Sequence, residues 1–188
     1  MDGSGKTTLA MSLMEELKKR GIPSKYVWCR WFPGLADPFH FIIRKTLGYT
    51  TEQYMLLKPL KIIYECLLIV DYAIWLFLKV RIRIRYVLII DRYVYDALTD
   101  LYFLQLNVSS FFRRLFVEMN PKPDITFYID VPLHVALLRR NDLSLKDARK
   151  YKKIYDVMAE THGFQKIINI DFGDARNQML KEVETIID

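Results

Sequence analysis

The sequence predicts an α/β protein built on a doubly wound parallel sheet with helices on both faces. A glycine-rich loop leads directly into an amphipathic helix over residues 7–20, and short apolar runs then alternate with helical stretches. The run at residues 86–90 is continuously apolar, which is typical of a parallel strand buried on both faces. The 188 residues, 52% of them hydrophobic, are enough for a packed core, and we expect one domain spanning residues 1–188.

The glycine-rich loop has the second half of a phosphate-binding pattern, Asp-Gly-Ser-Gly-Lys-Thr-Thr at residues 2–8. Its glycines let successive backbone amides turn toward phosphate oxygens. Lys6 can reach the terminal phosphates, and the Thr7 hydroxyl is placed to ligate Mg²⁺. A plain glycine-rich helix cap is the alternative, and it does not account for a lysine followed by two hydroxyl residues. The expected phosphate-binding residues are Gly3, Ser4, Gly5, Lys6, Thr7 and Thr8.

A phosphate loop normally follows a buried parallel strand, and the first glycine of the pattern would fall before Met1. We therefore expect the first strand of the fold to be missing from this chain because the sequence is truncated. A fold without that strand is the alternative.

The first helix is expected to end at Arg20, with Gly21 as the residue just past its end, and Pro23 prevents its continuation. A strand follows at residues 25–29 and then a turn-rich loop at residues 30–38. In doubly wound sheets, loops at the carboxyl end of a strand border the ligand crevice. This loop is therefore a candidate part of the binding site.

Residues 39–80 are mostly helical in pattern, with breaks near Gly48 and Pro59. The most apolar part, residues 66–78, contains Asp71 and falls well short of the roughly 20 apolar residues that a membrane span needs. We expect a buried core helix there. The rest of the chain is expected to form strands at residues 86–90, 125–129 and 166–170. Helices are expected at residues 95–119, from the end of Val131-Pro132 to residue 140, at 143–160 and at 177–187.

An acid follows the apolar strand directly, at Asp91, with Arg92 beside it. Phosphate-loop proteins place the carboxylate that orients Mg²⁺ or its water at such a position. An N-cap is the alternative role for Asp91. The adjacent guanidinium favours a phosphate crevice, because arginine pairs well with phosphate oxygens.

Basic residues gather in and before the charged helical region, and a solvated helix face is their default explanation. A phosphoryl-transfer enzyme also needs mobile positive charge that neutralises the transferring group and excludes water. The candidates are Arg139, Arg140, Arg149, Lys150, Lys152 and Lys153.

Composition limits the classes of ligand and the compartment that this protein is expected to have. The net charge of +6 suits phosphate-bearing ligands, and small nucleotides satisfy it without nucleic acid. The two cysteines, Cys29 and Cys66, show no metal-ligand spacing, and neither do the three histidines. We expect the cysteines to be buried thiols of a protein in a reducing compartment. Because the N-terminus is a phosphate loop, we expect no signal peptide and a cytoplasmic location. We expect no membrane partner, and a homodimer is left open.

Three segments together resemble the thymidylate kinase family: the loop at residues 2–8, the strand leading into Asp91, Arg92 and Tyr93, and residues 121–132. The resemblance spans nearly the whole chain and implies a P-loop NTPase fold. It implies an ATP- and Mg²⁺-dependent transfer of phosphate to a nucleoside monophosphate, with dTMP as the leading acceptor. A kinase for another nucleotide or phosphorylated small molecule, and a nucleotide-binding switch or ATPase module, are the alternatives.

The resemblance also assigns roles. The loop residues would hold ATP and Mg²⁺, and Asp2 matches an acid that faces the acceptor sugar. Asp91 and Arg92 match the pair that serves Mg²⁺ and the acceptor phosphate, and Phe32 lies in a loop near the acceptor's base and phosphate. Gly3 replaces the loop arginine of some members. In such members a lid arginine is catalytic, which points to Arg149 in a lid at about residues 141–153, with Arg139 and Arg140 as rivals.

The acceptor side departs from the family pattern. The family's base-recognising arginine falls on Tyr72, and a usual serine falls on Asp96. The arginine of the Phe-Pro loop falls on Leu35, although Arg30 is close by. Arg30, Phe32, Tyr72, Arg92 and Asp96, together with Asp2, are the expected substrate-binding residues.

Overall fold

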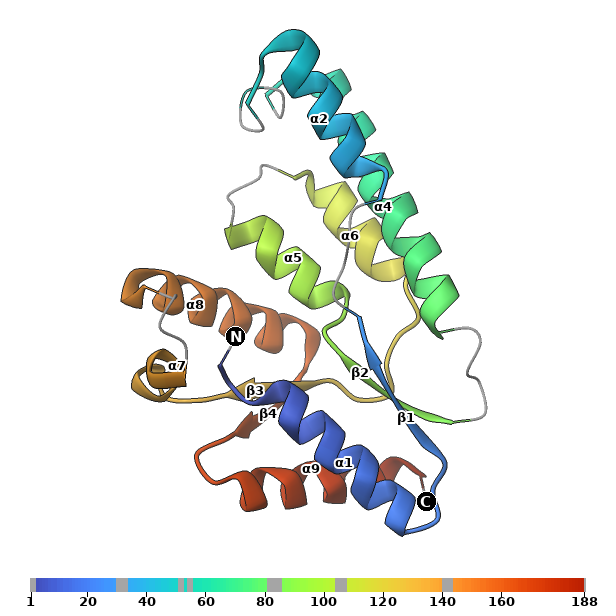
Figure 1. The fold of residues 1–188 in the computed structure, drawn as a ribbon, viewed down its shortest axis with the longest axis vertical. Coiled ribbons are helices and arrows are strands. Elements are labelled where there is room, and N and C mark those ends of the chain that lie inside the picture. Colours follow the sequence, from blue (N-terminus) through green and yellow to red (C-terminus); the bar gives the residue numbers. More distant parts are fainter. Residues whose placement is uncertain are drawn as a thin grey trace. The chain divides into compact units, whose positions relative to one another are not determined.

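The computed structural model describes residues 3–29, 34–50, 53, 56–80, 86–103, 108–139 and 144–187 (Figure 1). Contacts divide the chain into two compact units. The first, here the loop unit, comprises Met1–Trp28, Arg85–Asp91 and Pro123–Asp188. The second, the helical unit, comprises Cys29–Ile84 and Arg92–Lys122. Each unit is described by itself.

The loop unit contains the strands of the described chain. Its elements are α1 (Lys6–Lys19), β1 (Ser24–Trp28), β2 (Val87–Asp91), β3 (Phe127–Asp130), α7 (Leu133–Arg139), α8 (Leu145–His162), β4 (Gln165–Ile168) and α9 (Phe172–Ile187). The strands form two parallel pairs, β1 with β2 and β3 with β4. The predicted α/β class with parallel strands is therefore confirmed.

Helices α1 and α9 pack together and form one core with both strand pairs (Figure 1). The four-residue spacing of Leu9, Leu13 and Leu17 places all three on the buried face of α1, as the sequence predicts. The core cluster consists of Leu9, Leu13, Leu17, Ile129, Ile167, Ala175, Met179, Leu180 and Val183, with Val87, Ile89, Ile125 and Phe127 packed against it.

Strand β2 is less buried than its continuous apolar sequence predicts. The side chains of Val87 to Ile90 are partly exposed, and only Asp91 is fully buried. In the described part of the chain β2 pairs with β1 alone, so one of its edges carries no neighbouring strand. A strand at the edge of a sheet keeps part of its surface in solvent, which explains the difference.

The helical unit contains α2 (Ala36–Leu47), α4 (Lys58–Val80), α5 (Val94–Phe103) and α6 (Ser110–Glu118). The single helical region expected at residues 95–119 is therefore two helices, and α6 begins where the Ser109 hydroxyl accepts a hydrogen bond from the Phe112 amide. Helices α2 and α4 pack as one pair, and α5 and α6 as another (Figure 1).

Helix α4 is only half buried, so the expectation of a core helix over residues 66–78 is half correct. One face holds buried side chains, among them Leu68, Tyr72 and Leu76. The opposite face exposes Ile63, Cys66, Val70, Ile74 and Phe77, so the expectation of a buried thiol is correct for Cys29 and wrong for Cys66. Among the described helices, none has the length and apolar character required to cross a membrane.

Candidate functional site

The glycine-rich loop curls through two left-handed backbone positions, Gly3 with φ of 83° and Gly5 with φ of 82°. Both positions are also sterically closed. A Cβ on Gly3 would lie 3.0 Å from the Ala136 carbonyl oxygen, and one on Gly5 would lie 2.7 Å from Asn169 Nδ2. Only glycine fits both requirements, and α1 begins directly after Gly5 at Lys6. The geometry is that of an anion-binding loop at a helix N-terminus.

Two side chains from the C-terminal half of the chain hold the loop backbone. Asn169 Nδ2 donates to the Ser4 carbonyl oxygen over 2.7 Å, and both residues are buried. Arg139, in the last turn of α7, donates from Nη1 to the Gly3 carbonyl oxygen over 3.4 Å. The loop is therefore anchored by residues more than a hundred positions away in sequence.

Thr7 and Asp91 meet, as their predicted roles require. The Thr7 hydroxyl donates to Asp91 Oδ2 over 2.5 Å, and Asp91 is 4% exposed at the carboxyl end of β2. The Tyr26 hydroxyl, from β1, donates to the same carboxylate oxygen over 2.8 Å. Asp91 therefore does not serve as a helix N-cap through this oxygen; it joins the start of α1 to the end of the sheet.

The Thr7–Asp91 pair fits Mg²⁺ chemically. A hydroxyl and a carboxylate oxygen are the hard ligands that Mg²⁺ prefers, and this ion usually takes one or two protein ligands plus phosphates and water. Among the described residues no group of three or more His, Cys, Asp or Glu side chains could hold a metal. A cation at this pair would therefore depend on phosphate oxygens to complete its coordination.

The residue after Asp91 has an unusual backbone. Arg92 has φ of 66° and is the non-glycine residue with positive φ in the described part of the chain. A side chain with a Cβ pays a steric cost in this left-handed region, and such outliers gather at functional sites. The prediction that Arg92 is functional stays a prediction, and its backbone supports it.

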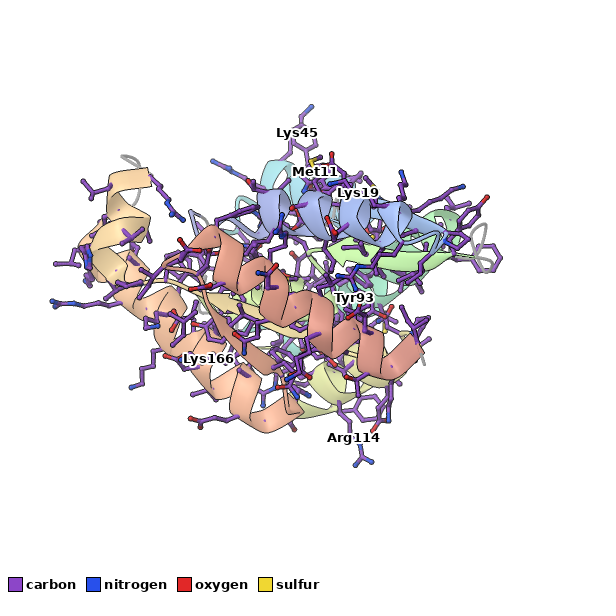
Figure 2. The ribbon with its side chains drawn as sticks, turned by 90° about the horizontal axis from the view of Figure 1, so that it is seen from below. Met11, Lys19, Lys45, Tyr93, Arg114 and Lys166 are labelled. Atoms are coloured by element: carbon purple, nitrogen blue, oxygen red, sulfur yellow. The ribbon has the colours of Figure 1, made fainter. Side chains whose placement is uncertain are left out.

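Acidic and basic side chains form a network at the other strand pair. Asp130, at the end of β3, forms ion pairs with Lys152 of α8 and with Lys166 of β4, the latter over 3.1 Å (Lys166 is labelled in Figure 2). Lys166 also pairs with Asp156 over 3.1 Å. Burial alone would raise the pKa of Asp130, but hydrogen bonds from the two lysines outweigh it and lower that pKa. Lys152 is therefore engaged in a structural network.

The other basic candidates differ in position. Arg139 contacts the loop, whereas Arg149 lies exposed on α8, with no hydrogen bond or ion pair in the described part of the chain. Arg140 and residues 141–143 of the expected lid lie outside the described residues. The same holds for Asp2, Arg30 and Phe32.

In the helical unit, polar side chains are largely used to hold the backbone. Both oxygens of the buried Asp71 carboxylate accept from the Leu35 amide, and Oδ2 also accepts from the Ala36 amide, each over 2.8 Å. Asp96 Oδ2 accepts from the Tyr93 amide over 3.1 Å, which caps the start of α5. These carboxylates stabilise helix N-termini.

Tyr72 is fully buried in this unit. Its ring packs against Phe116 with centroids 4.9 Å apart and lies 6.4 Å from the ring of Trp75. Its hydroxyl has no hydrogen-bond partner among the described residues. Burial raises the pKa of Tyr72, and nearby Cys29, Tyr93 and Asp96 raise it further, so the hydroxyl is neutral. An unpaired buried hydroxyl costs about 1–3 kcal/mol.

Two residues of the loop unit were not anticipated from the sequence, Tyr26 and Asn169. Tyr26 is an ordinary half-buried strand residue by pattern, and its only signal is its place near the carboxyl end of β1. Asn169 has a clearer signal, since an amide directly after an apolar strand is a polar group at the sheet edge where ligands bind.

Comparison with known proteins agrees with this geometry. The family model described as thymidylate kinase matches residues 1–186. A probable thymidylate kinase 1 from Saccharolobus solfataricus is 26% identical over 193 residues, which cover 100% of this chain and 93% of that protein. The match includes the loop, the Asp91 strand end and the helices between them, so it extends over the candidate site as well as the fold. The chain belongs to the thymidylate kinase family.

Proposed function

We propose that this protein is a nucleoside monophosphate kinase that uses ATP and Mg²⁺, with dTMP as the leading acceptor. Family membership supports a kinase of this class. The observation that carries the proposal is the Thr7–Asp91 contact beside the glycine loop, because it unites the two protein ligands of a phosphate-bound cation.

The proposed fold is the doubly wound sheet of P-loop NTPases, in which the two parallel strand pairs share one sheet. The support is that residues of β2 and β3 pack against the same core cluster. In such sheets, ligands bind at the carboxyl ends of the strands, where Asp91 and Asn169 stand. A single domain over residues 1–188 remains part of this proposal.

In this proposal the protein works by positioning and charge neutralisation, with little covalent chemistry of its own. Loop amides around Gly3, Ser4 and Gly5 hold the donor phosphates, and Lys6 neutralises the terminal ones. A bound Mg²⁺ would supply positive charge that stabilises the charge of the transferred group. Thr7 and Asp91 orient it, and Thr8 lies at the helix start.

On the acceptor side, Arg92 is proposed to hold the acceptor phosphate in line with the donor, and Asp2 to face the sugar. Arg149 supplies lid charge to the transferring group, with Arg139 and Arg140 as the rival arginines. The residues proposed to serve the base are Arg30, Phe32, Tyr72 and Asp96. A cytoplasmic location fits a nucleotide kinase.

Selectivity for the base is proposed to be relaxed. Tyr72 stands where the family has an arginine, so a fixed bidentate donor for a pyrimidine carbonyl is lost. The buried ring of Tyr72 packs on Phe116, which leaves its hydroxyl as the polar atom at this position. A site that lacks one hydrogen-bonding partner discriminates by about tenfold less.

The test is a coupled ADP-release assay over a panel of nucleoside monophosphates. We expect turnover of dTMP, with dUMP or another monophosphate within about tenfold in kcat/KM. A preference for dTMP of several orders of magnitude would contradict relaxed selectivity but keep the kinase. No turnover of any nucleotide, with ATP binding intact, would contradict the acceptor class and favour a switch or ATPase module.

A further inference from the structure

The loop peptide between Ser4 and Gly5 is held from one side by a side-chain amide. Asn169 Nδ2 donates to the Ser4 carbonyl oxygen over 2.7 Å, and the contact is buried. The same nitrogen lies 2.7 Å from where a Cβ of Gly5 would be, so the amide packs directly against the Gly5 backbone. Asn169 therefore contacts both ends of one peptide unit.

Asn169 is itself rigidly placed. Its backbone amide donates to the Asp130 carbonyl oxygen over 2.8 Å, which continues the parallel β3–β4 pairing by one residue. Its side chain is 3% exposed, so solvent does not compete for the amide. A short side chain on an anchored backbone has few alternative positions, and the Ser4 contact is consequently well defined.

Because the peptide is planar, this contact also fixes the direction of the Gly5 N–H. All peptide bonds described here are trans, and in a trans peptide the carbonyl and the following N–H point in opposite directions. When Asn169 holds the Ser4 carbonyl, the Gly5 N–H must point away from Asn169. Gly5, with φ of 82° and no Cβ, would otherwise allow this peptide to rotate at little cost.

A second, weaker contact acts on the preceding peptide. Arg139 Nη1 lies 3.4 Å from the Gly3 carbonyl oxygen, and Arg139 is exposed. By the same geometry, this contact directs the Ser4 N–H away from Arg139. The buried Asn169 contact is shorter and better protected, and so it is the stronger of the two.

We propose that Asn169 is a positioning residue for the donor phosphates: its amide fixes the Ser4–Gly5 peptide so that the Gly5 N–H faces the phosphate. This inference rests on the proposed phosphate-binding role of the loop and adds a residue to it. Without Asn169, the loop divides its time between competent and rotated peptides. The apparent dissociation constant then rises in inverse proportion to the fraction of loops that are competent.

The experiment measures equilibrium binding of ATP and of inorganic tripolyphosphate to the full chain and its Asn169→Leu variant. Leucine has a similar size and cannot donate. We expect both dissociation constants to rise about tenfold, the amount that one hydrogen bond is worth. In the kinase assay, KM for ATP should rise by a similar factor while kcat stays within about threefold, because bound phosphate restores the competent peptide.

A matched control separates positioning from stability. Asn120 is also buried and donates its amide to a backbone carbonyl, that of Phe116, in the helical unit. Asn120→Leu should lower the thermal midpoint as Asn169→Leu does, and leave tripolyphosphate affinity unchanged. If Asn169→Leu fails to fold, Asn169→Ala against Asn120→Ala gives the same comparison.

Three results are decisive. Weaker tripolyphosphate binding in the Asn169 variants alone supports the inference. Equal binding by wild type and the Asn169 variants overturns the inference and leaves the proposed function standing. Failure of wild type to bind either ATP or tripolyphosphate overturns the role of the loop, and the inference with it.

Discussion

The two units of this protein use their polar side chains differently. In the loop unit, Thr7, Tyr26 and Asp91 bond to one another, and Asn169 bonds to the loop backbone. In the helical unit, the carboxylates of Asp71 and Asp96 hold helix amides, and Glu65 accepts from both the amide and the hydroxyl of Ser109.

This difference separates what is constrained by chemistry from what is constrained by folding. Thr7, Asp91 and the loop backbone form the proposed place for phosphate and a cation, groups that phosphoryl transfer cannot exchange for others. The polar side chains of the helical unit secure the scaffold, and among the described residues of this unit the buried Tyr72 hydroxyl is left without a hydrogen-bond partner. In the proposed function, the donor side follows the family pattern and the acceptor side departs from it.

The most severe test of the comparison is Lys6→Ala, which removes the charge at the terminal phosphates. We expect kcat to fall by about 10³ or more, with weaker ATP binding, because transition-state charge loses a fixed counter-charge. Circular dichroism should be unchanged, since Lys6 is only half-buried in the first turn of α1 and is not a member of the core cluster. Unchanged turnover in a steady-state assay would remove the phosphate-loop argument.

The second test is Asp91→Asn, which keeps the side chain's shape and removes its charge. We expect kcat to fall by about 10² and the Mg²⁺ concentration for half-maximal activity to rise, since a neutral amide is a poor ligand for this cation. Asn caps helices about as well as Asp. A variant with normal turnover and normal Mg²⁺ dependence would therefore assign Asp91 a purely structural role.

The third test moves to the helical unit. Asp71→Ala removes the acceptor for the Leu35 and Ala36 amides, of which Ala36 is fully buried. The expected loss is about 3 kcal/mol in the free energy of unfolding, since hydrogen bonds to a charged group are each worth about 1.5–3 kcal/mol. Urea denaturation measures it. Asp71→Asn, which keeps one acceptor oxygen, should lose less.

The Asp71 variants also test whether the two units act independently, if tripolyphosphate affinity is measured beside stability. Asp71 is proposed to serve the scaffold only, so tripolyphosphate binding by folded Asp71→Asn should equal that of wild type. A change in phosphate affinity would mean that the two units are energetically coupled at this carboxylate.

The smallest expected effect is that of Tyr72→Phe. Removing a buried hydroxyl that has no hydrogen-bond partner among the described residues relieves its desolvation cost, so we expect stability to rise by up to about 1 kcal/mol. Tyr93→Phe is the control, because the Tyr93 hydroxyl donates to the Pro121 carbonyl and its loss should destabilise (Tyr93 is labelled in Figure 2). A clear loss of stability in Tyr72→Phe would show that its hydroxyl is bonded in solution.

Local patterns predicted much of the fold. The spacing of Leu9, Leu13 and Leu17 predicted α1, and four apolar runs predicted the four described strands to within a few residues. Helix α9 begins at Phe172 rather than at residue 177, because the Asp171 side chain accepts from the Asp174 amide and starts the helix early. That signal was present in the sequence as two acids three positions apart.

Other features depend on contacts that no local pattern contains. Tyr26 reaches Asp91 across 65 positions, and Asn169 reaches Ser4 across 165. The expectation that Thr7 and Asp91 cooperate rested on a known motif, whereas neither Tyr26 nor Asn169 belongs to one. The exposure of Ile74 and Phe77 on α4 was also hidden, because apolar content alone does not reveal how many neighbours cover a helix.

The left-handed backbone of Arg92 has a consequence for how variants of this protein would be selected. A library randomised at position 92 and sorted only for folded protein should become enriched in glycine and asparagine, which adopt φ of 66° with less strain. The same library sorted for phosphoryl transfer should keep arginine. The difference between the two selected sets would measure the backbone strain that the chain accepts in order to keep a guanidinium group at position 92.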